Sequence, residues 1–168
     1  MALDVGKARI GVAVSDASGF LASPYTTLRT SRDEAKTFEE IQRLLDETEA
    51  EALIVGLPIS LDGQIHAQGE LVRNFAGRLQ QHIHVPLIFW DERYSTVEAE
   101  RLLAERYQYG SEPGRRSTRR RGKPGERKGS GRTRGTQHGI DALAAAVILQ
   151  EYLDHQSSQV KENKDKSV

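Results

Sequence analysis

The segment Leu-Asp-Val-Gly-Lys-Ala-Arg-Ile-Gly-Val-Ala-Val-Ser occupies residues 3–15 and decides the fold. Large apolar residues alternate with small ones from Arg9 to Ser15, and this period of two predicts a β-strand. Leu3–Val5 predicts a short strand before it, and the turn residues Gly6–Ala8 lie between the two. We therefore expect an antiparallel hairpin at the start of the chain.

The rest of the sequence predicts strands and helices in alternation. Ser31 and Glu34 have capping-box spacing, which predicts a helix start at Ser31. The expected elements after the hairpin are an extended segment at 25–28, a helix from Ser31 to about Leu45, a strand at 52–55, a helix marked by Leu71, Val72, Phe75 and Leu79, a strand at 85–90, a helix from Ser95 to about Tyr107, and an apolar helix at 140–153. A hairpin followed by strand–helix crossovers implies an α/β fold. We expect a mixed five-stranded sheet, antiparallel in its first three strands and then parallel, flanked by helices.

Length and composition favour one soluble domain. The chain has 168 residues and no cysteine, which excludes a disulfide framework and a thiolate nucleophile. Its longest apolar run, Ala142–Leu149, is too short to span a bilayer, and the N-terminus lacks a signal-peptide pattern. We expect a cytoplasmic protein with no membrane partner, a single domain at 1–154, and a disordered polar tail at 155–168.

The charges are strongly segregated although they sum to zero. The segment 110–137 combines Gly, Pro, Ser and Arg without apolar periodicity, which predicts a flexible basic loop, here called the basic arm. Its cations are Arg115, Arg116, Arg119, Arg120, Arg121, Lys123, Arg127, Lys128, Arg132 and Arg134. An acidic body with a basic arm favours a polyanionic partner, so we expect the arm to bind nucleic-acid backbone. A loop that only improves solubility is the alternative.

Three acidic residues fall where a strand ends or a helix begins. Asp4 lies on the first strand, Glu92 follows the strand at 85–90, and Asp141 opens the last helix. Such positions converge in α/β sheets. Three converging carboxylates could hold one or two Mg²⁺ or Mn²⁺ ions, because these cations prefer oxygen ligands. Two such ions can support phosphodiester hydrolysis.

Each acid taken singly also has a purely structural interpretation. Asp141 could be a helix-terminal charge, Asp4 a turn residue, and the pair Asp91–Glu92 a solvated strand end. Side chains alternate along a strand, so at most one acid of that pair should join a site.

Taken together, the acidic positions lie in four ordered motifs that resemble one family. The motifs are Leu-Asp-Val-Gly-Lys-Ala-Arg-Ile-Gly-Val-Ala-Val-Ser-Asp (3–16), Ile-Val-Gly-Leu-Pro (54–58), Trp-Asp-Glu-Arg-Tyr-Ser-Thr-Val-Glu-Ala-Glu (90–100) and Ile-Asp-Ala-Leu-Ala-Ala-Ala-Val-Ile-Leu-Gln-Glu-Tyr-Leu-Asp (140–154). They resemble the YqgF/RuvX family of precursor 16S rRNA nucleases. That family has a ribonuclease H-like fold and is related to RuvC-type Holliday junction resolvases. The chain departs from the family in its short segment before Asp4 and in the length of its basic arm.

The resemblance implies a function and a set of site residues. It implies a metal-dependent nuclease in ribosome biogenesis, with Asp4, Glu92 and Asp141 as both catalytic and metal-binding residues and Mg²⁺ or Mn²⁺ as cofactor. The implied partner is precursor rRNA, alone or with the small ribosomal subunit, and the chain would be a monomer or homodimer. Two alternatives stay open: a Holliday junction resolvase acting on four-way DNA, and a non-catalytic RNA-binding assembly factor.

Three further residues are candidates near these motifs. Arg93 could contact a phosphate and could equally form a surface ion pair. Lys7 is a weaker candidate for a phosphate contact, and an ordinary surface cation is the simpler interpretation. His138 could assist proton transfer, and a loop histidine is the simpler interpretation.

Overall fold

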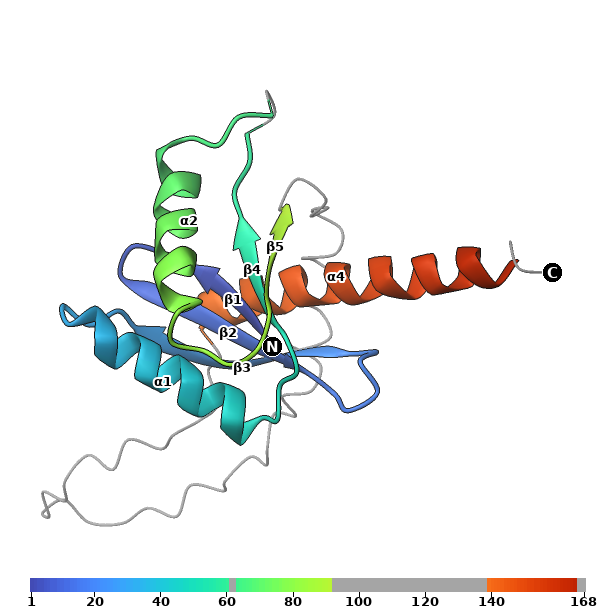
Figure 1. Cartoon of the computed structure of the whole chain (residues 1–168), viewed down its shortest axis with the longest axis horizontal. Helices are drawn as coiled ribbons and strands as arrows, with labels where there is room; N and C mark the ends of the chain where they lie inside the picture. Colours follow the sequence, from blue (N-terminus) through green and yellow to red (C-terminus); the bar gives the residue numbers. More distant parts are fainter. Residues whose placement is uncertain (61–62, 92–138, 166–168) are drawn as a thin grey trace, which may run out of the picture.

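A computed structural model of the chain describes residues 1–60, 63–91 and 139–165, and these form one sheet with helices on both faces (Figure 1). The strand order is β3-β2-β1-β4-β5. The elements are β1 (Ala2–Val5), β2 (Arg9–Ser15), β3 (Ala22–Arg29), α1 (Glu34–Glu47), β4 (Leu53–Leu57), α2 (Ala67–Leu79), β5 (Leu87–Asp91) and α4 (Ile140–Asp165).

The pairing of the strands confirms the expected mixed sheet. β1 pairs antiparallel with β2, and β2 pairs antiparallel with β3. β1 and β5 both pair parallel with β4. In the register of the hairpin, Asp4 lies opposite Gly11, and Gly11 lies opposite Thr27 on β3. Residues directly opposite one another share a face of the sheet, so these three positions form one row across it.

Each face of the sheet has its own apolar core. Leu3 and Val5 of β1 face α1 and α2, where they pack with Phe38 and Phe75. Ala2 of β1 faces α4 instead. Because side chains alternate along a strand, Asp4 lies on the same face as Ala2, under the start of α4. Figure 1 shows α4 continuing past the edge of the sheet toward the C-terminus.

Small residues let α4 lie very close to the sheet. Ala145 and Ala146 on the helix meet Ala2, Ala13 and Ala22 on the strands, and these five residues are fully buried. At the first turn of α4 the approach is closer still. A Cβ atom placed on Gly11 would lie 1.8 Å from the carbonyl oxygen of Asp141. This contact requires a glycine at position 11.

The third strand is longer than the sequence predicted, running from Ala22 rather than from Tyr25. Pro24, a residue typical of turns, lies inside it. β3 is an edge strand, and the pairing register shifts between Val12 and Ala13, the latter opposite Pro24. Edge strands and irregular pairing tolerate a residue that has no amide proton.

The helix expected from Ser31 begins three residues later, at Glu34, with Asp33 as its N-cap. The capping-box prediction was therefore wrong. The Ser31 hydroxyl accepts a hydrogen bond from the Asp33 amide, and the Ser31 amide donates to the Thr37 hydroxyl. These local bonds hold 31–33 in a turn before the helix.

The polar tail is also more ordered than expected. We predicted that the last helix ends near Leu153 and that disorder begins at His155, whereas α4 continues to Asp165. Hydrogen bonds one turn apart support the extension: Gln156 donates to the Tyr152 hydroxyl, and the Ser158 hydroxyl donates to the Asp154 carbonyl.

The predicted helix at 95–107 and the basic arm at 110–137 lie outside the described residues. Within the described ranges, no helix is both long and apolar enough to cross a membrane.

Gly11→Ala should destabilise the fold because the added methyl group overlaps the Asp141 carbonyl. We expect a loss of about 1–3 kcal/mol in the free energy of unfolding, the usual range for overpacking. Gly77→Ala is the matched control, since nothing lies within 4 Å of its Cβ position on α2. An alanine in a helix should leave stability unchanged or raise it by up to about 1 kcal/mol. Urea unfolding measures both, and equal midpoints for the two variants would contradict the close contact.

Candidate active site

Asp4 lies at the end of β1 on the face covered by α4. Its carboxyl is half-buried, and the next residues form the turn into β2. The turn is closed by a hydrogen bond of 2.9 Å from the Gly6 amide to the Arg9 carbonyl. The tight turn fixes the end of the strand and with it the position of the Asp4 side chain.

Asp141 reaches the same place from the other end of the described chain. It lies in the first turn of α4, which begins with hydrogen bonds from the Ala142 and Leu143 amides to the Gly139 carbonyl at 3.0 and 3.3 Å. The backbone of Asp141 rests on Gly11, the residue directly opposite Asp4. An acidic side chain in the first turn also interacts favourably with the positive end of the helix dipole.

The two carboxyl groups interact electrostatically. Burial raises the pKa of Asp4 above its ordinary value, and the negative charge of Asp141 raises it further. Both effects disfavour the ionised form of Asp4. The fold therefore brings two acids together at an energetic cost, an arrangement common at functional sites.

Arg9 offsets part of this negative charge. Its Nε atom lies 3.0 Å from Oδ2 of Asp141. Arg9 is two positions from Gly11 on β2, so its side chain starts on the face covered by α4. The sequence analysis did not single out this arginine, although the alternation along 9–15 places it on the face of Asp4.

Thr27 is a second polar residue that the sequence analysis missed. Its hydroxyl is buried and has no hydrogen-bond partner within the described part of the chain. It lies opposite Gly11 and beside Gly139, whose Cβ position would be 3.1 Å from Oγ1 of Thr27 and 3.8 Å from Oδ2 of Asp141. Thr27 therefore completes a row of polar groups beside the start of α4.

The third expected acid, Glu92, lies outside the described residues. The strand before it is informative about its neighbour Asp91. Trp90 faces α4, whereas Leu87 packs on the opposite face with α1 and α2. Asp91 ends β5 four residues after Leu87, so its side chain lies on the same face of the sheet as that of Leu87. That face is the one away from Asp4. This geometry excludes Asp91 as the partner of Asp4 and Asp141.

The described carboxylates have the chemistry that a hard divalent cation requires. Asp4 and Asp141 offer oxygen ligands, and a cation between them would offset the repulsion that raises the pKa of Asp4. Among residues 1–60, 63–91 and 139–165, no group of three acidic or histidine side chains gathers closely enough to hold a metal. The two acids thus fit part of a metal site.

The residues expected to bind nucleic acid are only partly described. Lys7 is exposed in the β1–β2 turn and lines a pocket on the other face of the sheet from Asp4. Arg93, His138 and the ten cations of the basic arm lie outside the described residues.

Asp4→Asn should stabilise the metal-free protein, because it removes a half-buried charge that Asp141 repels. Surface substitutions usually change the free energy of unfolding by less than about 0.5 kcal/mol. In EDTA we expect the free energy of unfolding of Asp4→Asn to exceed that of the wild type by more than this. Asp33→Asn, the same substitution at an exposed position, should change the free energy of unfolding by less than that amount. Thermal unfolding compares the variants, and a destabilised Asp4→Asn would show that the carboxylate is favourably held.

The chain is similar in sequence to a known protein family along most of its length. A family model described as RuvX, Holliday junction resolvase, matches residues 1–118. A protein of Thermoanaerobacter pseudethanolicus named "Putative pre-16S rRNA nuclease" is 38% identical over 95% of this chain and 98% of its own length. A protein of the same name from Dehalococcoides mccartyi is 40% identical over 89% of this chain and 93% of its own length.

A solved structure supports the fold independently. The structure titled "T. thermophilus RuvC in complex with Holliday junction substrate" matches with a TM-score of 0.52 at 16% identity. The match covers 91% of this chain and 92% of that one. At this identity the likeness concerns the fold alone, and it confirms the expected ribonuclease H-like architecture. With the family model matching most of the chain and relatives nearly 40% identical along their whole length, the chain belongs to the RuvX family.

Proposed function

We propose that this protein is a metal-dependent nuclease that hydrolyses phosphodiester bonds in precursor 16S rRNA in the cytoplasm. The observation that carries the proposal is the convergence of Asp4 and Asp141. These residues are far apart in the sequence and lie close together near the carboxyl end of β1. The names of its relatives support the choice of substrate.

In this proposal Asp4, Asp141 and Glu92 hold Mg²⁺ or Mn²⁺. When bound, the cation supplies Lewis-acid activation of water and stabilises charge on the leaving oxygen. The protein's own contribution is positioning: the Gly11 contact fixes the backbone of Asp141, and Arg9 holds its carboxylate. Outer partners of this kind orient metal ligands.

The substrate backbone would be held by cations outside the acidic site. The basic arm would provide most of them, and Lys7 and Arg93 are the other candidates. Such contacts are largely independent of sequence, and log affinity should fall by about 0.7 per neutralised phosphate on single strands for each tenfold rise in salt. The arm contains no aromatic residue, so base stacking cannot be its mode of binding.

A Holliday junction resolvase is the second candidate, favoured by the description of the family model. A resolvase must cut two strands symmetrically and therefore requires a dimer. A strict monomer in sedimentation that does not cleave a four-way DNA junction excludes it.

Asp4→Asn and Asp141→Asn should each slow Mg²⁺-dependent cleavage of a precursor 16S rRNA fragment by at least about 100-fold. Loss of even an outer partner of a metal ligand typically costs about 10- to 100-fold. EDTA should abolish wild-type cleavage, and Mn²⁺ should restore it. Gel assays with the RNA fragment and a four-way DNA junction in parallel measure both activities.

The acid pair after β5 provides a matched control for this assay. Glu92→Gln should slow cleavage by at least about 100-fold, as the other two variants do. Asp91→Asn should leave it within about threefold of wild type, since strand alternation points Asp91 away from Asp4. The reverse result would identify Asp91 as the ligand, and wild-type rates in all variants would refute a carboxylate-based nuclease.

Deletion of residues 112–137 separates the nuclease from the non-catalytic assembly factor. We expect weaker binding with a smaller salt dependence, but residual cleavage of short RNA, because Asp4, Glu92 and Asp141 remain. Complete loss of RNA binding in the deletion variant, with its fold intact by circular dichroism and no RNA cleavage by the wild type, would favour a non-catalytic binding protein that works through its arm alone.

A further inference from the structure

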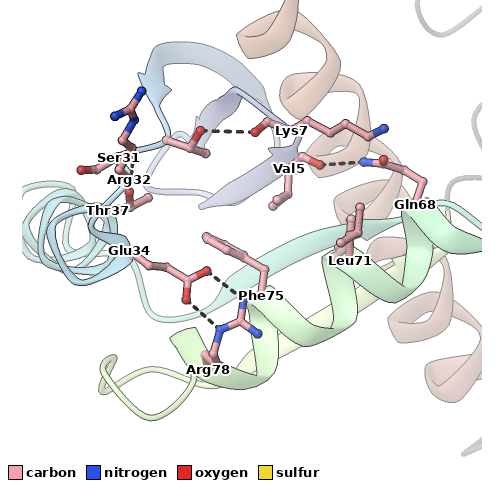
Figure 2. A pocket seen from close by; sticks show the side chains of 13 residues that line it. Val5, Lys7, Ser31, Arg32, Glu34, Thr37, Gln68, Leu71, Phe75 and Arg78 are labelled. Carbon is pink, nitrogen blue, oxygen red and sulfur yellow. Dashed lines mark hydrogen bonds and ion pairs between the residues drawn. The ribbon is translucent and has the colours of Figure 1, made fainter.

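A pocket of about 520 Å³ lies near the carboxyl end of β1, as Asp4 does, but on the opposite face of the sheet. It is enclosed by the end of β1, the β3–α1 connection and α2 (Figure 2). Val5 and Lys7 line it, and they follow Asp4 in the chain by one and three residues. Only the end of β1 and the turn after it separate the pocket from the candidate active site.

The pocket has an apolar floor. Val5, Val72 and Phe75 are buried there, and Figure 2 shows Leu71 beside them on α2. The helical periodicity of 71–79 predicts Leu71 on the buried face, yet its side chain is 52% exposed. Leu71 therefore exposes apolar surface at the pocket, beside the buried Phe75.

Polar groups surround this floor. Thr30, Ser31 and Gln68 contribute hydroxyl and amide groups to the lining. The Gln68 amide lies 3.4 Å from the Val5 carbonyl, a long contact that it could exchange for a bond to a ligand. Groups that both donate and accept hydrogen bonds suit the edge of a nucleobase.

The charges at the pocket mouth are positive. Glu34 is neutralised by Arg78, whose Nε and Nη2 atoms donate hydrogen bonds of 2.7 and 2.8 Å to its carboxylate. Lys7 and Arg32 are exposed, and within the described part of the chain neither side chain has a hydrogen bond or ion pair. Figure 2 shows both extending outward from the hollow. They are placed to meet phosphates that flank a group inserted between them.

We propose that this pocket holds one unstacked nucleotide of a single-stranded RNA segment next to the cleaved bond. The inference rests on the proposed nuclease function and adds how the substrate is placed. The base lies on Leu71 and Phe75, its edge faces Gln68, and the flanking phosphates contact Lys7 and Arg32. The strand then crosses the β1–β2 turn to reach Asp4. A base in a duplex cannot enter, so the pocket selects single-stranded substrate.

Leu71→Glu tests this proposal, because it places a negative charge where the base and its phosphates would lie. The probe is a fluorescein-labelled single-stranded RNA of about ten nucleotides, measured by fluorescence anisotropy in EDTA so that no cleavage occurs. We expect a roughly tenfold loss of affinity, the scale of one base contact. Affinity for an RNA duplex of equal length should change less than about twofold, since the duplex uses backbone contacts alone.

Phe20→Glu is the matched control for this substitution. Phe20 is 74% exposed, does not line the pocket, and gains the same charge. It should leave single-strand affinity unchanged. As an independent variant, Lys7→Gln with Arg32→Gln should also weaken single-strand binding, and Lys36→Gln on α1, outside the pocket lining, should not.

Four outcomes would overturn the proposal. Unchanged single-strand affinity in Leu71→Glu would show that no nucleotide enters, and equal losses for single strand and duplex would show a general charge effect. AMP or UMP binding to the pocket as tightly as the RNA, without competition from it, would assign the pocket to a free nucleotide. If the wild type cleaves RNA in Mg²⁺ and Leu71→Glu has the same KM, the pocket proposal alone fails. If the wild type does not cleave RNA, the proposed function fails first.

Discussion

The start of α4 lies directly on β2 because residue 11 has no side chain. Any Cβ atom at this position would collide with the carbonyl oxygen of Asp141, and the alanines farther along the helix maintain the same close approach. The contact joins the last described helix to the first hairpin. Asp141 is thereby fixed beside Asp4, and the candidate site depends on this one packing constraint.

The same contact creates an electrostatic problem that the fold only partly solves. Asp4 is half-buried near a second carboxylate, and its pKa is raised by both effects. Arg9 reaches Asp141 but is itself largely exposed, so solvent weakens its compensation. Two acids held together with too little positive charge favour a bound cation, and a cation is also what a polyanionic substrate needs in order to approach them.

Local patterns in the sequence were sufficient to predict most of the fold. The hairpin, the parallel crossovers and the strand containing Asp4 follow from alternation and turn residues within a few positions of one another. The predictions failed where contacts that the sequence pattern does not reveal decide the outcome. Pro24 joins β3 because that strand is at an edge, and Ser31 stays outside α1 because Thr37 accepts its amide proton.

The arrangement of the candidate site was likewise predicted only in part. The convergence of Asp4 and Asp141 could be predicted because Asp4 lies near the end of a recognisable strand, Asp141 lies at the start of a recognisable helix, and their motifs resemble one family. The positions of Arg9 and Thr27 beside these acids could not be predicted. They depend on the cross-strand register and on where α4 packs against the sheet. Leu71 has helical periodicity typical of a core residue, and only the shape of the pocket shows that it is exposed.

Direct titration of Mn²⁺ into the full-length protein tests the central claim, that Asp4 and Asp141 act together in binding a divalent cation. Isothermal calorimetry should detect binding to the wild type, and Asp4→Asn and Asp141→Asn should each weaken it by at least about tenfold. Asp33→Asn should bind as the wild type does. Wild-type Mn²⁺ affinity in both active-site variants would contradict the account, because the convergence of these carboxylates would then have no role in metal binding.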